Sequence, residues 1–239
     1  MGKRILITGS EGLLGGLIRD VLKEEHELIL LDKLGDRPID LLKEDIAPCF
    51  NGVDTVFHFA ANPRPWISEK EAKENIDMTW KVLNACKDHI RRIIYASSIN
   101  VYDMHRLYGV EQITGETRLC PNTKIAWRVA RGGIYYGISK IVCESLIRSY
   151  HHGFGINALN LRLGCVTPDN IPYDNEPEDP AVWLSHEDFL EIIKRSVDFR
   201  GYAELVCTSN NEDAFVDLSP IKETLGYFPQ SNSKNHKRK

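Results

Sequence analysis

The sequence predicts an α/β fold in which helices cover both faces of a doubly wound parallel sheet. Short apolar runs alternate along the chain with segments of helical periodicity, and a glycine-rich turn follows the first run. The chain has 239 residues, of which 42% are hydrophobic, so it can bury one large core.

The apolar runs are mostly continuous, which is typical of strands buried on both faces of a sheet. We expect strands over residues 4–8, 27–31, 55–59, 92–96, 156–163 and 204–207, and helices over residues 13–24, 70–89, 136–150 and 185–197. Strands and helices that alternate in this way form a parallel sheet. The interval 31–45 is too short for a full helix and is predicted to hold a loop and a brief strand.

Composition and charge exclude several classes of protein. The formal charge is −4, so no basic field favours a nucleic acid or a membrane surface. The six cysteines form no CxxC pair and no cluster at zinc-ligand spacing, which predicts free thiols and no metal site. No apolar run reaches transmembrane length. We therefore expect a cytoplasmic protein with a small-molecule partner.

The first turn has the glycine spacing of a phosphate-binding site, with Gly9, Gly12 and Gly15 between a strand and a helix. Such glycines let the backbone approach a pyrophosphate, and the helix N-terminus supplies N–H groups. Asp32 ends the next strand, where a carboxylate accepts hydrogen bonds from the adenosine ribose and repels a 2′-phosphate. NAD is therefore predicted over NADP, although Lys33 and Arg37 leave NADP open.

A second pattern lies in the helix predicted at 136–150. Tyr136 and Lys140 stand four residues apart, so their side chains share one helix face. Ser98 comes two residues after the strand at 92–96, in front of Asn100 and Tyr102. The order of glycine turn, acidic strand end, serine and YxxxK matches what a nicotinamide enzyme requires.

These motifs make the chain resemble an extended short-chain dehydrogenase/reductase, in the NAD-dependent epimerase/dehydratase family. The segments at 57–61 (FHFAA) and 161–164 (LRLG) add to the likeness, which runs from residue 2 to about 230. The segments at 183–189 (WLSHEDF) and 225–230 (LGYFPQ) are most similar to uronate dehydrogenase-like sugar dehydrogenases.

The resemblance implies a catalytic role for three residues. Tyr136 would be the general acid/base, and Lys140 would hold the nicotinamide ribose and lower the tyrosine pKa. Ser98 would hydrogen-bond the reacting oxygen. The chemistry agrees, because a free phenol with a pKa near ~10 is a poor base at neutral pH and a nearby ammonium favours its phenolate.

The resemblance also implies a set of cofactor contacts: Gly9, Gly12, Leu13, Leu14 and Gly15 at the phosphates, Asp32 at the ribose, Asp40 and Leu41 beside the adenine, and Ala60, Ala61, Asn75 and Lys140 along the rest of the cofactor. His58 lies inside an apolar strand and is interpreted as a core histidine.

Substrate contacts are expected from Asn62 and Asn100, as ligands of sugar hydroxyls. The insertion 103–133 is interpreted as a lid whose Arg128 and Arg131 bind an anionic sugar, with a solvated surface loop as the alternative. Arg64 is another possible cation. Acidic residues at 176–179 stand where the resemblance leads us to expect a carboxylate-binding arginine, which disfavours a uronate.

The predicted organisation is a Rossmann-type NAD-binding domain over residues 1–168 that carries the triad, a small C-terminal substrate lobe over 169–230 with a strand and helix returning to the core, and a frayed basic tail over 231–239. The predicted function is an NAD-dependent oxidoreductase that transfers hydride between a sugar (aldose, uronate or sugar phosphate) and nicotinamide. A nucleotide-sugar epimerase or dehydratase that retains NAD is the first alternative, and a non-catalytic NAD-binding sensor is the second. By resemblance, a homodimer forms through the helices at 70–89 and 136–150.

Overall fold

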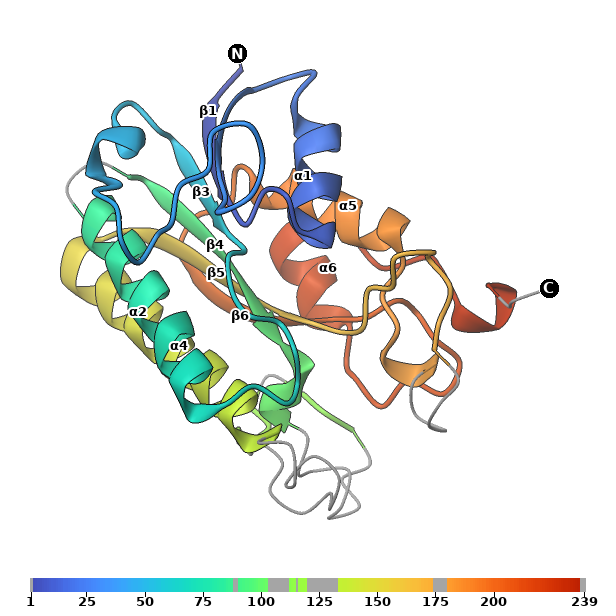
Figure 1. The fold of residues 1–239 in the computed structure, drawn as a ribbon. Helices are drawn as coiled ribbons and strands as arrows, with labels where there is room; N and C mark the ends of the chain where they lie inside the picture. The colour runs from blue at the N-terminus through green and yellow to red at the C-terminus, as the bar shows by residue number, and fades with distance from the viewer. Residues whose placement is uncertain are drawn as a thin grey trace.

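A computed structural model describes residues 2–87, 90–102, 112–114, 116–119, 133–173 and 180–236 (Figure 1). A six-stranded parallel sheet forms its centre, in the order β2-β1-β3-β4-β5-β6. The strands are β1 Arg4–Thr8, β2 Glu27–Leu31, β3 Thr55–His58, β4 Arg92–Ser98, β5 Asn157–Leu163 and β6 Tyr202–Cys207. The predicted doubly wound sheet is confirmed, and β4 runs two residues further than expected, to Ser98.

Helices cover both faces of the sheet. They are α1 Leu13–Leu22, α2 Glu69–Cys86, α4 Gly133–Phe154, α5 His186–Ser196 and α6 Ser219–Leu225. Helix α2 packs against α4 on one face, and α1 packs against α5 on the other (Figure 1). The short α6 was not expected from periodicity, because seven residues hold barely two turns.

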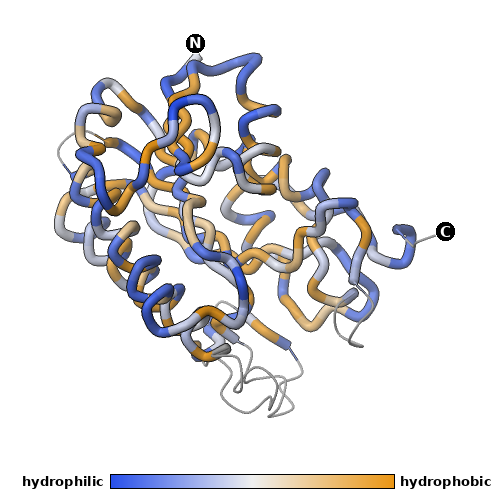
Figure 2. The backbone as a smooth tube through the Cα atoms, viewed as in Figure 1, coloured by the Kyte–Doolittle hydropathy of each residue, from blue (hydrophilic) through white to orange (hydrophobic). Residues whose placement is uncertain are grey.

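Two buried clusters explain why the sheet needs both layers. Ile5 and Ile7 of β1 belong to the cluster beneath α1 and α5, whereas Leu6 between them belongs to the cluster beneath α2 and α4. Successive strand residues point to opposite faces of the sheet. Because the residues at successive positions are apolar, helices must shield both faces from water. The hydrophobic residues accordingly concentrate in the strands and on the inner sides of the helices (Figure 2).

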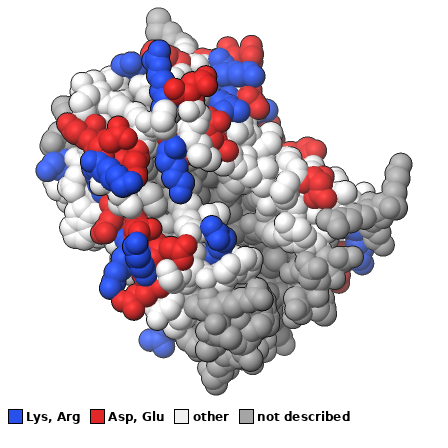
Figure 3. All heavy atoms as spheres, in the orientation of Figure 1, with Lys and Arg blue, Asp and Glu red and all other residues white. Residues whose placement is uncertain are grey.

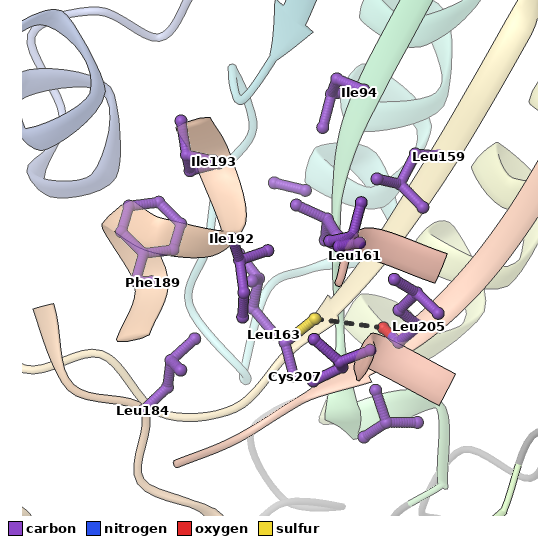
Figure 4. Close-up of a cluster of buried hydrophobic side chains, with 14 of the residues drawn as sticks. Ile94, Leu159, Leu161, Leu163, Leu184, Phe189, Ile192, Ile193, Leu205 and Cys207 are labelled. Carbon is purple, nitrogen blue, oxygen red and sulfur yellow. Dashed lines mark hydrogen bonds between the residues drawn. The ribbon is translucent and has the colours of Figure 1, made fainter. Parts of the chain in front are cut away.

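The first of these clusters joins the C-terminal part of the chain to the sheet. Phe189 and Ile192 of α5 pack with Leu159 and Leu161 of β5 (Figure 4). Strand β6 pairs with β5 along its whole length. Strand β6 and helix α5 of the C-terminal segment therefore belong to the common core.

Two local expectations were wrong. Residues 32–46 contain no strand, because the Asp32 carboxylate accepts a hydrogen bond from Leu34 N at 3.0 Å and the Ile39 amide donates to the Asp32 carbonyl, which bends the chain away from the sheet edge. Residues 231–236 of the tail do not fray. Ser231 N donates to the buried carboxylate of Asp188, and the His236 ring packs against Trp183 at 4.7 Å between ring centroids, with the two planes tilted by 46°.

Candidate active site

The described residues that the sequence predicts for the site lie around the carboxyl ends of β1, β2, β3 and β4. The strand order reverses at β1, which has β2 on one side and β3 on the other. In open α/β sheets, ligands bind outside the carboxyl ends of the strands at this switch point. The turn at 9–15 follows β1, and Ala60 and Ala61 follow β3.

Two of the three glycines in the turn are required by the fold itself. Gly9 has φ +75°, and a Cβ there would lie 2.7 Å from Ala60 N. A Cβ on Gly15 would lie 2.0 Å from the Gly9 carbonyl oxygen. Helix α1 could not approach the sheet this closely with larger residues.

Gly12 is different, because little in the protein opposes a side chain there. A Cβ on Gly12 would meet only the Gly9 carbonyl oxygen, at 3.3 Å. Gly12 is the N-cap of α1, and no side chain caps the helix at that end. The open N-terminus, with Leu13 and Leu14 in its first turn, therefore fits a pyrophosphate that approaches its N–H groups.

Asp32 lies beside this turn. Its carboxylate accepts a hydrogen bond from Glu11 N at 3.0 Å, so the end of β2 is tied to the glycine loop. A carboxylate here fits the ribose hydroxyls of an adenosine whose pyrophosphate lies on α1. Nearby, Leu41 is buried, and a hydrogen bond with Lys43 lowers the pKa of the Asp40 carboxyl.

Helix α4 brings Tyr136 and Lys140 to the end of β4. Both side chains are buried, and Lys140 Nζ lies 5.6 Å from the centroid of the Tyr136 ring. The ammonium donates a hydrogen bond to the Ala96 carbonyl at 2.6 Å, two residues before Ser98. Burial lowers the pKa of Lys140 to about 8. The structure thus joins the YxxxK helix to the strand that ends in the serine.

Ser98 and Asn100 bind each other. The Ser98 hydroxyl donates to Asn100 Oδ1 at 2.9 Å and accepts from Asn100 N at 3.2 Å. These bonds fix the turn from β4 into η2 (Ile99–Tyr102), with Ser98 only 7% exposed. Both residues therefore lie at the carboxyl edge of the sheet, as the sequence predicts.

The loop after β3 packs against the tyrosine. Ile67 and Ala72 form a small buried cluster with Tyr136. The Asn75 amide accepts from Asn62 N at 2.7 Å and donates to the Asn62 carbonyl at 3.2 Å, which holds this loop on α2. The bonds between Asn62 and Asn75 therefore fix the loop that packs against Tyr136.

His58 is a core histidine, as expected. Its ring nitrogens hydrogen-bond Thr8 Oγ1 at 2.8 Å and Thr79 Oγ1 at 3.0 Å, and the side chain is fully buried. Burial, together with the charge of Lys140, lowers the pKa of His58 to about 3, so the ring is neutral at physiological pH. It connects β1, β3 and α2 below the glycine turn.

The expected cationic residues divide into two groups. Arg128 and Arg131, with most of the insertion 103–133, lie outside the described residues. Arg64 lies exposed on the loop that packs against Tyr136, and it forms no ion pair with any residue that the structure describes. On the face drawn in Figure 3, charges of both signs are interspersed among the described residues.

Within the described ranges, no group of three or more His, Cys, Asp or Glu residues could hold a metal ion. No helix in the part of the chain that the structure describes is long and apolar enough to cross a membrane.

Sequence reasoning missed the residues that support the lysine and serine. Lys140 is anchored by a backbone carbonyl, for which residue types give no signal. Beside Ser98, the hydroxyl of Ser97 binds Glu144, which in turn pairs with Arg162, and all three are buried. Both charged residues could have been noticed in the sequence, because charged side chains are rarely buried. Glu144 follows Lys140 by one helical turn, and Arg162 lies inside an apolar strand.

A comparison with protein families decides the relationship. The model of the NAD dependent epimerase/dehydratase family matches residues 5–178. The chain belongs to this family. Membership confirms the family resemblance that the motifs indicate. It also confirms the prediction of NAD as the cofactor, because the family is NAD dependent.

Several relatives of the chain are named as sugar dehydrogenases. The chain is 29% identical to an L-arabinose 1-dehydrogenase (NAD(P)(+)) of Haloferax volcanii, over 96% of this chain and 97% of that protein. It is 27% identical to an NAD-dependent glucose-6-phosphate dehydrogenase of the same organism, over 98% and 95% of the two chains. The structure superimposes on a glucuronic acid dehydrogenase of Chromohalobacter salexigens with a TM-score of 0.81 at 25% identity, over 98% and 87% of the two chains.

Proposed function

We propose that this protein is an NAD-dependent sugar dehydrogenase that uses Tyr136, Lys140 and Ser98 as its catalytic residues. The observation that carries the proposal is the placement of Lys140, buried next to the Tyr136 ring and bound to the Ala96 carbonyl close to Ser98. The near full-length match to the arabinose and glucose-6-phosphate dehydrogenases supports a net oxidation.

The roles follow from the side chains. Bound NAD supplies a hydride acceptor for the sugar carbon. Tyr136 takes the proton of the reacting hydroxyl as its general base, and the Lys140 ammonium favours the tyrosine phenolate. Ser98 donates or accepts a hydrogen bond at the reacting oxygen. The open N-terminus of α1 and the Asp32 carboxylate hold the two ends of the adenosine diphosphate part.

The substrate is a small sugar. The relatives are named for a neutral aldose, a phosphorylated aldose and a uronic acid, so sugars of all three kinds are candidate substrates. Arg64, on the loop beside Tyr136 and without an ion pair among the described residues, is the described cation that we assign to an anionic group of the sugar. Arg128 and Arg131 remain proposed ligands on sequence grounds, as do Asn62 and Asn100.

Two broader expectations also remain proposals. We assign residues 169–230 to the substrate side of the site, although β6 and α5 belong to the common core. We place the protein in the cytoplasm, because the described cysteines are free thiols, which suits a reducing compartment.

A homodimer through α2 and α4 is likewise proposed. Three large apolar side chains on these helices are exposed, namely Trp80 at 50%, Ile138 at 37% and Phe154 at 53%. Burying them against a second copy would remove apolar surface from water. Sedimentation of the wild type and of Trp80→Glu tests this, since a monomeric wild type would refute the dimer.

The test of the function is a substrate panel. Aldoses, aldose phosphates and uronates are supplied with NAD, and NADH is followed by absorbance. We expect stoichiometric NADH from one of these classes, and Tyr136→Phe should lower kcat by about 100-fold or more with NAD affinity unchanged. NAD that stays bound with no net NADH would instead favour an epimerase or dehydratase, and an intact cellular role for Tyr136→Phe would favour a sensor.

A further inference from the structure

A buried group of charges lies behind the proposed active site and takes no part in the proposed chemistry. Arg162 of β5 makes a two-pronged ion pair with Glu144 of α4, with distances of 3.0 Å from Nε to Oε1 and 2.8 Å from Nη2 to Oε2. Both side chains are only 2% exposed. Arg162 also binds Glu204 of β6, which Arg148 of α4 binds in turn. The positive charges of two arginines therefore neutralise the negative charges of two carboxylates.

This ion pair also holds the segment that carries Ser98. Ser97 of β4 donates a hydrogen bond to Glu144 Oε1 at 2.5 Å. Arg162 donates to the hydroxyl of Tyr102, at the end of η2. The segment 97–102 is thus fixed at both ends, by Glu144 at Ser97 and by Arg162 at Tyr102. Ser98 and Asn100 lie between these two points.

The same pair holds the helix that carries the tyrosine and lysine. Glu144 follows Lys140 by four residues and Tyr136 by eight, so the three side chains share one face of α4. Arg162 lies opposite Ser97 in the β4–β5 register. One buried ion pair therefore connects the two halves of the site, namely α4 and the turn after β4.

We propose that Glu144 is a positioning residue that, through Ser97 and Arg162, sets Ser98 against Tyr136 and Lys140. A buried ion pair contributes little net stability compared with well-packed apolar residues, so its presence calls for a reason other than stability. Fixed orientation is such a reason, because small displacements of reacting groups reduce turnover strongly. The inference rests on the proposed function for its effect on catalysis, but not for its effect on local structure.

The test compares four variants of the full chain. Glu144→Gln removes the charge, Ser97→Ala removes the bond at one end of the segment and Tyr102→Phe removes the bond at the other. Glu204→Gln is the matched control, since it removes the other carboxylate that binds the same arginine, and the further hydrogen bonds of that carboxylate are to Arg148 of α4 and Tyr202 of β6. Amide hydrogen exchange of residues 97–102, kcat and the NAD dissociation constant are measured for each.

We expect Glu144→Gln and Ser97→Ala to speed exchange of residues 97–102 about tenfold and to lower kcat about tenfold, with the NAD dissociation constant within about threefold of wild type. A fifth variant that combines Glu144→Gln with Ser97→Ala should have a kcat no lower than that of Glu144→Gln alone, because both substitutions act on the one contact between Ser97 and Glu144. Glu204→Gln should leave exchange in 97–102 and kcat near wild type.

Unchanged exchange in Glu144→Gln and Ser97→Ala would overturn the proposal, as would equal losses in Glu204→Gln. If Glu144→Gln does not fold, Ser97→Ala and Tyr102→Phe decide the question, because both keep the ion pair. If the wild type oxidises no sugar, the proposed function fails, and the exchange measurement still decides whether Glu144 positions segment 97–102.

Discussion

Replacing Gly12 with alanine should separate cofactor binding from folding. Gly12 has φ −74° and ψ 168°, which alanine adopts without strain, and its Cβ would meet only one atom, at 3.3 Å. Alanine is a poorer N-cap than glycine but restricts the unfolded chain, and each effect is worth up to about 1 kcal/mol with opposite sign. We therefore expect Tm to change by less than about 4 °C.

The same methyl group should weaken NAD binding. It would stand at the open N-terminus of α1, where the pyrophosphate must come close to the backbone. Losing one hydrogen bond to a charged oxygen costs about 1.5–3 kcal/mol, which corresponds to a rise of about 10- to 150-fold in the dissociation constant. Calorimetric titration with NAD measures this value directly.

Gly9→Ala is the matched control. At φ +75° alanine costs about 1–2 kcal/mol, and the Cβ would also press on Ala60 N at 2.7 Å. We expect a loss of at least about 2 kcal/mol, or about 4–8 °C in Tm, before any ligand is added. If Gly12→Ala binds NAD as tightly as the wild type does, the turn is not the pyrophosphate site and the reasoning is wrong.

Three further outcomes are expected. Asp32→Ala should raise the dissociation constant for NAD and reduce the ratio of the NADP to the NAD dissociation constant, because the carboxylate that repels a 2′-phosphate is gone. An unchanged ratio would show that Asp32 does not contact the ribose. His58 has a folded-state pKa of about 3 against an ordinary value near 6.5, so the unfolded chain binds a proton that the folded chain does not, and stability falls as the pH drops from 6.5 towards 3. Urea unfolding at pH 7 and pH 4.5 should show the wild type losing about 2–3 kcal/mol more than His58→Gln, and equal losses would contradict a neutral buried ring. Arg64→Ala should raise KM for an anionic sugar about tenfold and leave KM for NAD unchanged, whereas equal effects on neutral and anionic sugars would dismiss Arg64 as the cation.

Local patterns account for what could be predicted. Continuous apolar runs predicted the strands, because a strand buried on both faces has apolar residues at successive positions. The helical period predicted the long helices, because a helix buried on one face repeats its apolar residues every three to four positions. The glycine turn and YxxxK were visible for the same reason: a tight turn and a shared helix face depend on residues only a few positions apart.

The failures arose where a distant or backbone contact decides the conformation. Residues 32–46 bend away because the Asp32 side chain and carbonyl bind amides later in the same loop. Residues 231–236 are ordered because Asp188, more than 40 positions earlier, accepts the amide of Ser231. Residue spacing does not reveal that Asp188 is the partner of Ser231.

By itself, then, the sequence determined the α/β fold, and it indicated the glycine turn and the tyrosine, lysine and serine that we propose as the site, since each of these patterns depends on local chemistry. Only the tertiary structure decided how those groups are held. The Ala96 carbonyl beneath Lys140 and the Glu144–Arg162 pair behind Ser98 join segments that are 44 and 18 positions apart. The reason is physical: buried polar groups must find partners within about 3 Å, and the packing of strands against helices, rather than the order of residues, determines which groups come that close.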